Sequence, residues 1–374
     1  MAAGGAGGGQ RLDFWFTAWR RELYSTLPKL AVDLAVRAER QAWSGMWVID
    51  SQNLAGDPYA SLALAARETD KIEMGPGVTN PYTRHPAVTA SAIATIQEIS
   101  DGRAVLGIGR GDSALGFLGA GPAPFAVFRR YLDAVQAYLR GDSVPFEPER
   151  IEQAGLVPFA RAQIGHAPEA SRIEWLDPEA PKVPMDVAAT GPKVIALAAR
   201  ISERISISVG ADPARIAWAI DIARTARREA GLDPAGLSIG VFVNLVVTDD
   251  KPLGREMLAP ALAGFARFSA MHGKRQGPLD AEQRAVIERI GQSYSMGDHG
   301  KAGSAQMNAL TDGFIDSFGV VGSTDHCIER LRQIAALGVD RVSVMGPCSK
   351  KHRLAEQESD ERFVTEVMPS FRGR

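Results

Sequence analysis

The chain contains 374 residues, with 42 basic and 44 acidic side chains and 45% hydrophobic residues. This near-balance of charge gives no electrostatic footprint for nucleic acid or an anionic membrane surface, and no stretch reaches the roughly 18 uninterrupted apolar residues of a membrane helix. The only cysteines, Cys327 and Cys348, favour a reducing compartment and argue against a zinc cluster. The composition therefore predicts a cytoplasmic globular protein that binds neither nucleic acid nor membrane.

The N-terminal segment MAAGGAGGGQ (1–10) has no early basic cluster and no long apolar run. We therefore expect no secretory signal there, and interpret it as a disordered lead-in. The remaining residues, 11–374, are expected to form a single domain, since α/β barrels often reach this length as one unit.

Short apolar segments alternate with segments of helical periodicity along the chain. The predicted strands are 12–19, 45–52, 71–81, 103–109, 184–192, 204–210, 237–250 and 340–347. The predicted helices are 27–43, 57–70, 85–102, 124–141, 192–203, 212–231, a long helical region 251–317, one helix within 317–338, and 358–371. Three helix starts carry local signals: Asp57 before Pro58, Pro86 in the first turn, and Thr324 as an N-cap.

Eight strands separated by helices are typical of a parallel sheet, and their continuous apolar character favours a closed (β/α)8 barrel, the TIM barrel. Segments 142–180 and 251–317 are longer than a crossover needs, so we expect insertions after strands four and seven. An open doubly wound sheet is the structural alternative. In a barrel, functional residues lie just after the strands, at their C-terminal ends.

The fourth strand ends in the glycine-rich stretch RAVLGIGRGDSALG (103–116). Asp112 stands where a dinucleotide-binding fingerprint would have its third glycine, and the fingerprint belongs to the first strand–helix turn of its fold. Two interpretations remain: the glycines only let the backbone turn, or the bare backbone approaches a flat ligand beside the carboxylate of Asp112.

The third strand ends in GPGVTNPYTRHP (75–86). The β-branched Val78 is unusual in a plain turn, so a bulge there could press Val78 against a ring system while Thr79 and Asn80 offer hydrogen bonds. The alternative is a proline-punctuated loop that leads into a helix.

The segment AATGPKVIALAAR (188–200) is the best generic anion site in the chain. A strand ends at Thr190 and Gly191, a proline opens the next helix, and Lys193 lies in its first turn. Free backbone N–H groups, the positive end of the helix dipole and a lysine could together hold a phosphate. The alternative is a well-capped helix with a solvated lysine.

Few other residues suggest chemistry. Asp50 follows the second strand and could orient a ligand, act as acid or base, or cap a turn. His85 borders the predicted site and His299 lies in the second insertion, but no pair of residues has metal-ligand spacing, so we expect no metal. No Gly-x-Ser-x-Gly elbow occurs either. The difficult chemistry is therefore expected to come from a bound cofactor.

Residues 75–116 closely resemble the bacterial-luciferase-like superfamily of (β/α)8-barrel oxidoreductases, and ATGPKVIALAAR (189–200) and SFGVVGSTDHCIERL (317–331) are also similar. Within that superfamily they are most similar to the branch typified by methylenetetrahydromethanopterin reductase and the F420-dependent glucose-6-phosphate dehydrogenases. The resemblance implies the 5-deazaflavin coenzyme F420 as cofactor, or FMN as in sister branches. It also implies a non-prolyl cis peptide at Gly77–Val78, behind the ring, with Thr79 and Asn80 at the ring edge.

The same resemblance implies further site residues. The phosphate side of the cofactor would be held by Thr190, Gly191, Lys193 and Val194. The cofactor would also contact Asp50, Arg110 and Gly111. Asp112 takes the position of the glutamate that acts as acid or base in the glucose-6-phosphate enzymes, so Asp112, with Asp50, is the expected catalytic residue.

One departure concerns the substrate. The glucose-6-phosphate enzymes have a histidine directly after the cofactor-contacting aspartate, whereas this chain has Ser51, which puts their proton relay in doubt. The leading hypothesis is an F420-dependent transfer of a hydride to or from a small organic substrate. An FMN-dependent monooxygenase and a non-catalytic flavin-binding barrel are the alternatives, and homodimers are common among relatives.

Overall fold

The computed structural model describes residues 11–18, 27–163, 165–166, 168–271, 277–299, 303–349 and 351–372. Residues 1–10, expected to be a disordered lead-in, lie outside them. Within the described ranges, no helix combines the length and the apolar character that crossing a membrane requires.

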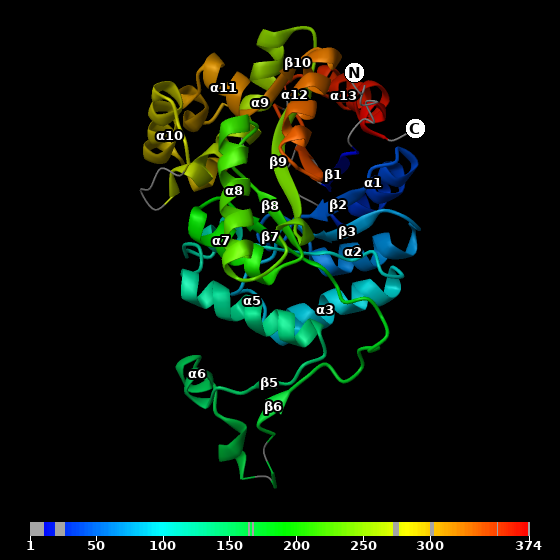
Figure 1. Ribbon diagram of the computed structural model, residues 1–374, viewed down its shortest axis with the longest axis vertical. Helices are drawn as coiled ribbons and strands as arrows, with labels where there is room; N and C mark the ends of the chain where they lie inside the picture. Colours follow the sequence, from blue (N-terminus) through cyan, green and yellow to red (C-terminus); the bar gives the residue numbers. More distant parts are fainter. Residues whose placement is uncertain are drawn as a thin grey trace, which may run out of the picture.

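Eight parallel strands form the centre of the molecule (Figure 1). They are β1 (Asp13–Ala18), β2 (Gly45–Val48), β3 (Glu73–Pro76), β4 (Leu106–Ile108), β7 (Met185–Ala189), β8 (Arg204–Ile207), β9 (Ser238–Val247) and β11 (Arg341–Met345). Their spatial order is β3-β2-β1-β11-β9-β8-β7-β4. β3 and β4, the first and last strands in this order, are joined by two parallel bridges, Met74 with Ala104 and Thr79 with Ile108. The expected TIM-barrel fold is therefore confirmed over the open sheet.

Helices surround the barrel, and most begin where local signals predict. They are α1 (Pro28–Arg40), α2 (Pro58–Arg67), α3 (Pro86–Ile99), α5 (Phe125–Leu139), α7 (Pro192–Ile201), α8 (Pro213–Glu229), α12 (Thr324–Ala336) and α13 (Arg353–Arg362). Asp57 caps α2 by accepting a hydrogen bond from the Ala60 N–H. The predicted cap of α12 is wrong by one residue, because Ser323 accepts from the His326 N–H and Thr324 is already helical. The last helix also begins earlier than predicted, at Arg353 rather than 358.

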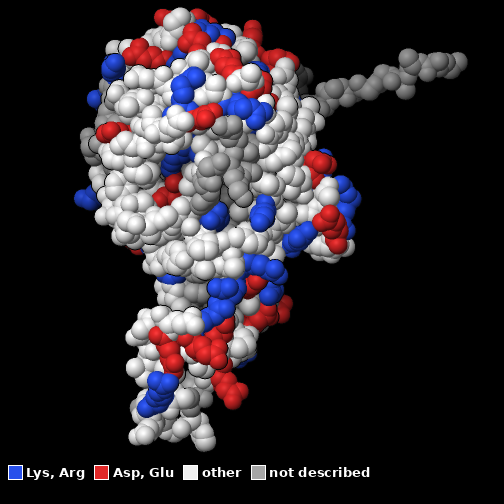
Figure 2. Space-filling view, turned by 90° about the vertical axis from the view of Figure 1, so that its left-hand side faces the viewer, with Lys and Arg blue, Asp and Glu red and all other residues white. Residues whose placement is uncertain are grey.

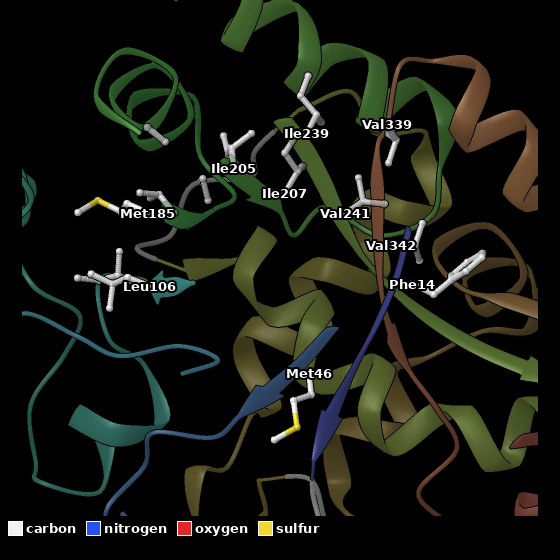
Figure 3. Packing of buried hydrophobic residues seen from close by; sticks show 14 of the residues in the cluster. Phe14, Met46, Leu106, Met185, Ile205, Ile207, Ile239, Val241, Val339 and Val342 are labelled. Atoms are coloured by element: carbon white, nitrogen blue, oxygen red, sulfur yellow. The ribbon is translucent and has the colours of Figure 1, made fainter. Parts of the chain in front are cut away.

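Alternate strand side chains point outward and form the main core against the helices (Figure 3). The other set fills the barrel, where Trp15 and Trp47 pack with ring centroids 4.3 Å apart. Below them, Arg341 and Asp186 form a buried ion pair of 2.6 Å. A side chain at Gly45 would meet the Trp15 ring at 2.2 Å, so the lumen has no further room there. This packed interior leaves the strand ends as the place for a ligand.

The two expected insertions are present. The described residues of the first insertion, 142–163, 165–166 and 168–180, form an arm that projects from the barrel and carries many charged side chains (Figures 1 and 2). The arm contains the antiparallel pair β5 (Val144–Pro145) and β6 (Ala170–Ser171) and helix α6 (Pro148–Gln153). The second insertion contains α9 (Lys251–Ala266), α10 (Ala281–Ser293) and α11 (Asp312–Phe318). It is followed by a short strand that was not predicted, β10 (Val320–Gly322), which pairs with β9.

Candidate active site

A cavity of about 320 Å³ lies at the C-terminal ends of the strands. The loops after β2, β3, β4 and β7 line one part of it, and residues at the end of α9 and just after it line another. Its wall is mainly apolar, with Ile49, Leu54, Val78, Val194, Phe242, Phe265, Phe268, Met271 and Met345. A largely apolar hollow with a few polar groups is the usual form of a small-molecule site.

The end of β3 carries the expected bulge and the expected cis peptide. The Gly77–Val78 bond is cis. Between the two bridges that join β3 to β4, five steps along one strand (Met74 to Thr79) match four along the other (Ala104 to Ile108), so β3 carries one extra residue. Gly77 and Val78 line the cavity as a result.

Thr79 and Asn80 lie behind this bulge and not on the cavity wall. Both are buried. Asn80 holds the next turn, since its Oδ1 accepts from the Tyr82 and Thr83 N–H groups and its Nδ2 donates to Thr83 Oγ1. Their predicted contact with a ring edge stays a prediction.

The glycines in and directly after β4 allow close approach and a turn. A Cβ at Gly107 would lie 2.1 Å from the Pro76 carbonyl oxygen, so only glycine lets β4 approach β3 here. Gly111 has φ +81°, a conformation that favours glycine. Gly109 presents bare backbone to the cavity beside Val78. The glycines therefore shape the turn and leave bare backbone on the cavity wall, while the approach of a flat ligand to this backbone stays a prediction. Arg110, Gly111 and Asp112 follow on the same wall.

Three of the four residues of the predicted phosphate site lie on the cavity wall, and the binding of an anion there stays a prediction. Thr190, Gly191 and Val194 line the cavity where α7 begins, and Thr190 Oγ1 donates to the Ser208 carbonyl at 3.2 Å. Lys193 is exposed and is not among the lining residues. The helix N-terminus therefore faces the cavity, whereas the lysine beside it does not.

Asp50 lines the cavity and forms an ion pair with Arg84. The Arg84 guanidinium donates to it at 2.7 Å and also binds Asp57 at 2.9 Å. Burial raises the pKa of Asp50, and the charge of Arg84 opposes that rise. Arg84 lies 4.8 Å from the centre of the Tyr59 ring. Asp50 is thus held in place from outside the cavity.

Asp112 is paired as well, with a residue that the sequence did not point out. Its carboxylate forms an ion pair with Arg267, which directly follows α9. The Arg267 guanidinium lies 4.7 Å from the ring centres of both Phe268 and Tyr294, and it donates to the Gly264 carbonyl at 2.5 Å. Arg267 is 6% exposed, so its position is fixed by packing as well as by charge.

The second insertion also brings His299 to the cavity wall. Its Nδ1 lies 2.5 Å from the Tyr294 hydroxyl. Burial, and then the nearby charge of Arg267, lower the pKa of His299 to about 3. Burial raises the pKa of Tyr294, against the effect of Arg267. His299 was noticed in the sequence, but nothing there pointed to Tyr294 as its partner.

Polar contacts also join the loops after β2 and β4. The hydroxyls of Ser51 and Ser113 lie 3.3 Å apart, and Gln52 Nε2 donates to the Ala114 carbonyl at 2.9 Å. Ser51, which stands where the glucose-6-phosphate enzymes have a histidine, therefore contacts the residue after Asp112. Across the part of the chain that the structure describes, no group of three or more His, Cys, Asp or Glu side chains could hold a metal ion.

Comparison with known proteins gives close relatives over most of the chain. It is 30% identical to a 5,10-methylenetetrahydromethanopterin reductase of Archaeoglobus fulgidus over 326 residues, 84% of this chain and 89% of the relative. It is 28% identical to the enzyme of that name from Methanolobus tindarius over 320 residues, 84% of this chain and 90% of the relative.

Solved structures share the fold. A coenzyme F420-dependent tetrahydromethanopterin reductase from Methanopyrus kandleri matches with a TM-score of 0.71 and 23% identity, over 97% of this chain and 100% of the other. An F420-dependent secondary alcohol dehydrogenase in complex with an F420–acetone adduct matches with a TM-score of 0.67 and 18% identity, over the same shares. The family model described as luciferase-like monooxygenase matches residues 14–341. With this match over most of the barrel, the chain belongs to the luciferase-like monooxygenase family.

Proposed function

We propose that this protein is an F420-dependent oxidoreductase that transfers a hydride between the deazaflavin coenzyme and a small organic substrate. The observation that carries the proposal is the cavity wall at the ends of β3 and β4, where the bulged Val78 lies beside the bare backbone of Gly109. The sequence relatives are named as F420-dependent enzymes or as methylenetetrahydromethanopterin reductases, which supports the same cofactor.

The residues present fit a deazaflavin. Gly77, Val78 and Gly111 form the surface against which a tricyclic ring can pack, with Thr79 and Asn80 fixing the bulge from behind. Asp50 and Arg110 offer polar groups at its edge. The start of α7, with Thr190, Gly191 and Val194, suits a phosphate, since helix N-termini favour anions. Lys193 would add its charge from outside the cavity wall. When bound, the coenzyme supplies or accepts the hydride.

The chain itself positions the reactants and controls water and protons. The apolar side chains of Phe242, Phe265 and Phe268 leave little room for water beside the ring, which strengthens electrostatic effects in the site. The two acids of the cavity are held by arginines, Asp50 by Arg84 and Asp112 by Arg267. We propose that Asp50 orients the cofactor and that Asp112 controls the proton balance of the site through its ion pair.

We also propose that residues 11–374 work as one domain, in the cytoplasm, as a homodimer. The alternative function is an FMN-dependent monooxygenase, because a Baeyer–Villiger monooxygenase in complex with FMN shares the fold with a TM-score of 0.61.

Titration of the purified protein with F420 and, separately, with FMN tests the cofactor, with intrinsic tryptophan fluorescence as the readout. We expect saturable binding of F420 and much weaker binding of FMN. Submicromolar affinity for FMN with no response to F420 would reverse the assignment.

Oxidation of reduced F420 by added carbonyl compounds then tests catalysis. If none of the compounds oxidises it, the protein binds the coenzyme without catalysing hydride transfer. We expect Asp112→Asn to retain F420 binding and to slow turnover, and unchanged turnover would remove Asp112 from the mechanism.

A further inference from the structure

We propose that the arm formed by the first insertion docks onto the barrel of a second copy of this chain. The base of the arm is tied to its own barrel, whereas its outer part exposes large apolar side chains and an excess of acidic ones. The proposal rests on the homodimer proposed above and deepens it, because it names the segment that holds the two copies together. It does not depend on which cofactor the cavity binds.

The arm leaves the barrel at the end opposite the cavity. It connects the C-terminus of α5, at Leu139, to the start of β7, at Met185. In a parallel barrel such helix-to-strand connections lie at the N-terminal ends of the strands, whereas the cavity lies at their C-terminal ends. From there the arm projects away from the barrel (Figure 1). It therefore does not cover its own cavity, and contact with another protein surface fits its position.

The base of the arm is fixed to its own barrel. The hydroxyls of Tyr138 in α5 and Ser171 in β6 lie 2.9 Å apart and share a hydrogen bond. Ile173, directly after β6, is buried in the main core. Beyond the paired strands, the Phe146 N–H donates to the Glu169 carbonyl at 2.9 Å. These contacts give the arm a defined direction where it leaves the barrel.

The outer part of the arm has almost no core of its own. Among its described residues between β5 and β6, only Pro158 is buried. Leu156 is 65% exposed, Val157 is 73% exposed and Phe159 is 52% exposed. Exposed apolar side chains that gather in this way mark contact sites on soluble proteins. Ordering such a segment costs conformational entropy that needs buried apolar surface in return, so the arm in this form needs a partner that covers it.

The charge of the arm points to a second copy of the chain as this partner. The sequence from 142 to 180 contains eight acidic and three basic side chains, which gives a net charge of −5. Because the whole chain has a net charge of −2, the rest of it has +3. Two arms that faced each other would repel, whereas an arm on a barrel brings opposite charges together. The charges therefore favour contact between the arm of one copy and the barrel of the other.

The acidic excess of the arm is not neutralised from within. Each of its three arginines already forms an ion pair with an acid of the same arm, in the pairs Arg150–Glu147, Arg161–Glu152 and Arg172–Glu174. In the part of the chain that the structure describes, Glu149 and Glu169 form no ion pair. Basic side chains gather around the point where the arm leaves the barrel, and acidic ones lie further along it (Figure 2). The outer arm is therefore suited to a basic surface on its partner.

A symmetric dimer satisfies this contact twice. Each copy offers one arm and one barrel, so two identical arm-to-barrel contacts form around a two-fold axis, which is the commonest symmetry of homo-oligomers. Leu156, Val157 and Phe159 of each copy are buried in such a dimer, and Glu149 and Glu169 gain basic partners. The arm thus obtains from the second copy the core that it lacks in the first.

The first experiment measures the dimer Kd of the purified full-length chain by analytical ultracentrifugation. We expect wild type to be a dimer at micromolar concentration. The triple variant Leu156→Ser, Val157→Ser, Phe159→Ser should raise the Kd by about 100-fold or more, because three apolar side chains lose their buried positions together. The matched control is Leu354→Ser, since Leu354 is 81% exposed on α13, at the other end of the molecule from the arm (Figure 1). A monomeric wild type, or the same Kd in wild type and the triple variant, would overturn the proposal.

The second experiment tests the charge of the contact. The double variant Glu149→Lys, Glu169→Lys should raise the dimer Kd by about tenfold or more at low salt, because it brings like charges together, and the difference from wild type should shrink as salt is added. The control is Glu358→Lys, which changes an exposed acid on α13. An unchanged or lower Kd in the double variant would contradict docking on a basic surface and would overturn the proposal.

The third experiment identifies the surface that the arm touches. A photoreactive benzophenone side chain replaces Val157 in ¹⁵N-labelled protein, which is mixed with unlabelled wild type below the dimer Kd, concentrated and irradiated. We expect cross-links from the labelled arm to unlabelled peptides outside residues 142–180. Cross-links to the unlabelled arm, or only to peptides of the labelled chain itself, would overturn the contact between arm and partner barrel.

The outcomes separate this proposal from the earlier ones. A dimer that keeps its Kd in both sets of arm variants overturns the role of the arm and leaves the homodimer intact. A monomeric wild type overturns both. If wild type does not bind F420, the proposed function fails, and the ultracentrifugation and cross-linking results still decide whether the arm joins two copies.

Discussion

The cavity wall beside Val78 gives the sharpest test of where the proposed cofactor ring would lie, through the single substitution Gly109→Ala. The backbone of Gly109 does not have the positive φ that would strain an alanine. The added Cβ would lie 3.0 Å from Val78 Cγ2 and 3.8 Å from the Ala188 Cβ. The first contact is tighter than ordinary packing, so Val78 must shift by a few tenths of an ångström, and one side of it is open cavity.

We expect this crowding to act mainly on the bound state. In the free protein Val78 can move into the cavity, so thermal stability should change little. With a ring packed against the wall that movement is blocked, and overpacking of this kind costs about 1–3 kcal/mol. Because about 1.4 kcal/mol is a factor of ten in Kd, the affinity for F420 should fall by roughly 5- to 150-fold.

Calorimetric titration of Gly109→Ala with F420 measures the effect, alongside thermal unfolding. The matched control is Gly121→Ala, since a Cβ at Gly121 meets nothing within 4 Å. If Gly109→Ala unfolds like wild type and binds F420 with the same Kd, the ring does not pack on this wall. A loss of the same size in Gly121→Ala would point to a general effect of the loop.

Three further predictions follow from other parts of the structure. Lys193→Ala should weaken F420 binding only about twofold in the same titration, because an exposed charge contributes under about 1 kcal/mol; a loss above tenfold would mean that the lysine turns to the phosphate on binding. Arg341→Met should lower the free energy of unfolding in urea by about 3–5 kcal/mol, since it leaves the buried Asp186 carboxylate without its cation. The double variant Arg341→Met with Asp186→Leu should recover most of this loss. If the single and the double variant lose the same free energy of unfolding, the prediction is wrong. Since the pKa of His299 is lowered to about 3, the folded state binds fewer protons than the unfolded state below about pH 6.5. The free energy of unfolding should therefore decrease as the pH is lowered below about 6.5, by up to about 1.4 kcal/mol per pH unit in wild type and less steeply in His299→Gln. If the thermal unfolding temperatures of the two proteins change in parallel with pH, the imidazole is not buried in its neutral form.

The barrel could be predicted because its signals are local. A strand covered on both faces is an apolar run, and Pro58 and Pro86 mark the first turns of α2 and α3. Function in such a barrel lies after the strands, so Asp50, Val78, Gly111, Asp112 and Gly191 could be placed on one cavity from position alone.

What escaped prediction depends on contacts between distant segments. Arg267 comes from an insertion with no periodic relation to the loop that holds Asp112, and their ion pair forms only in the folded chain. The position of Lys193 in the first turn of α7 did not show which way its side chain points, and in the structure Val194 lines the cavity instead. The cap of α12 failed for a simpler reason, because Ser323 and Thr324 are equally good caps by type.

The two acids of the cavity show how the barrel and its insertion divide the work. Asp50 is held by Arg84 on the loop that leads from β3 into α3, so the barrel fixes its orientation without the insertion. Asp112 is held by Arg267, which follows α9 within the insertion. The same insertion carries Phe265, Phe268 and His299 to the cavity wall. A change in the insertion therefore alters the charge and the apolar surface on one side of the cavity, while the wall formed by Val78, Gly109 and the start of α7 stays as it is. We therefore propose that the strand ends determine which cofactor binds and that the insertion after β9 determines which substrate binds.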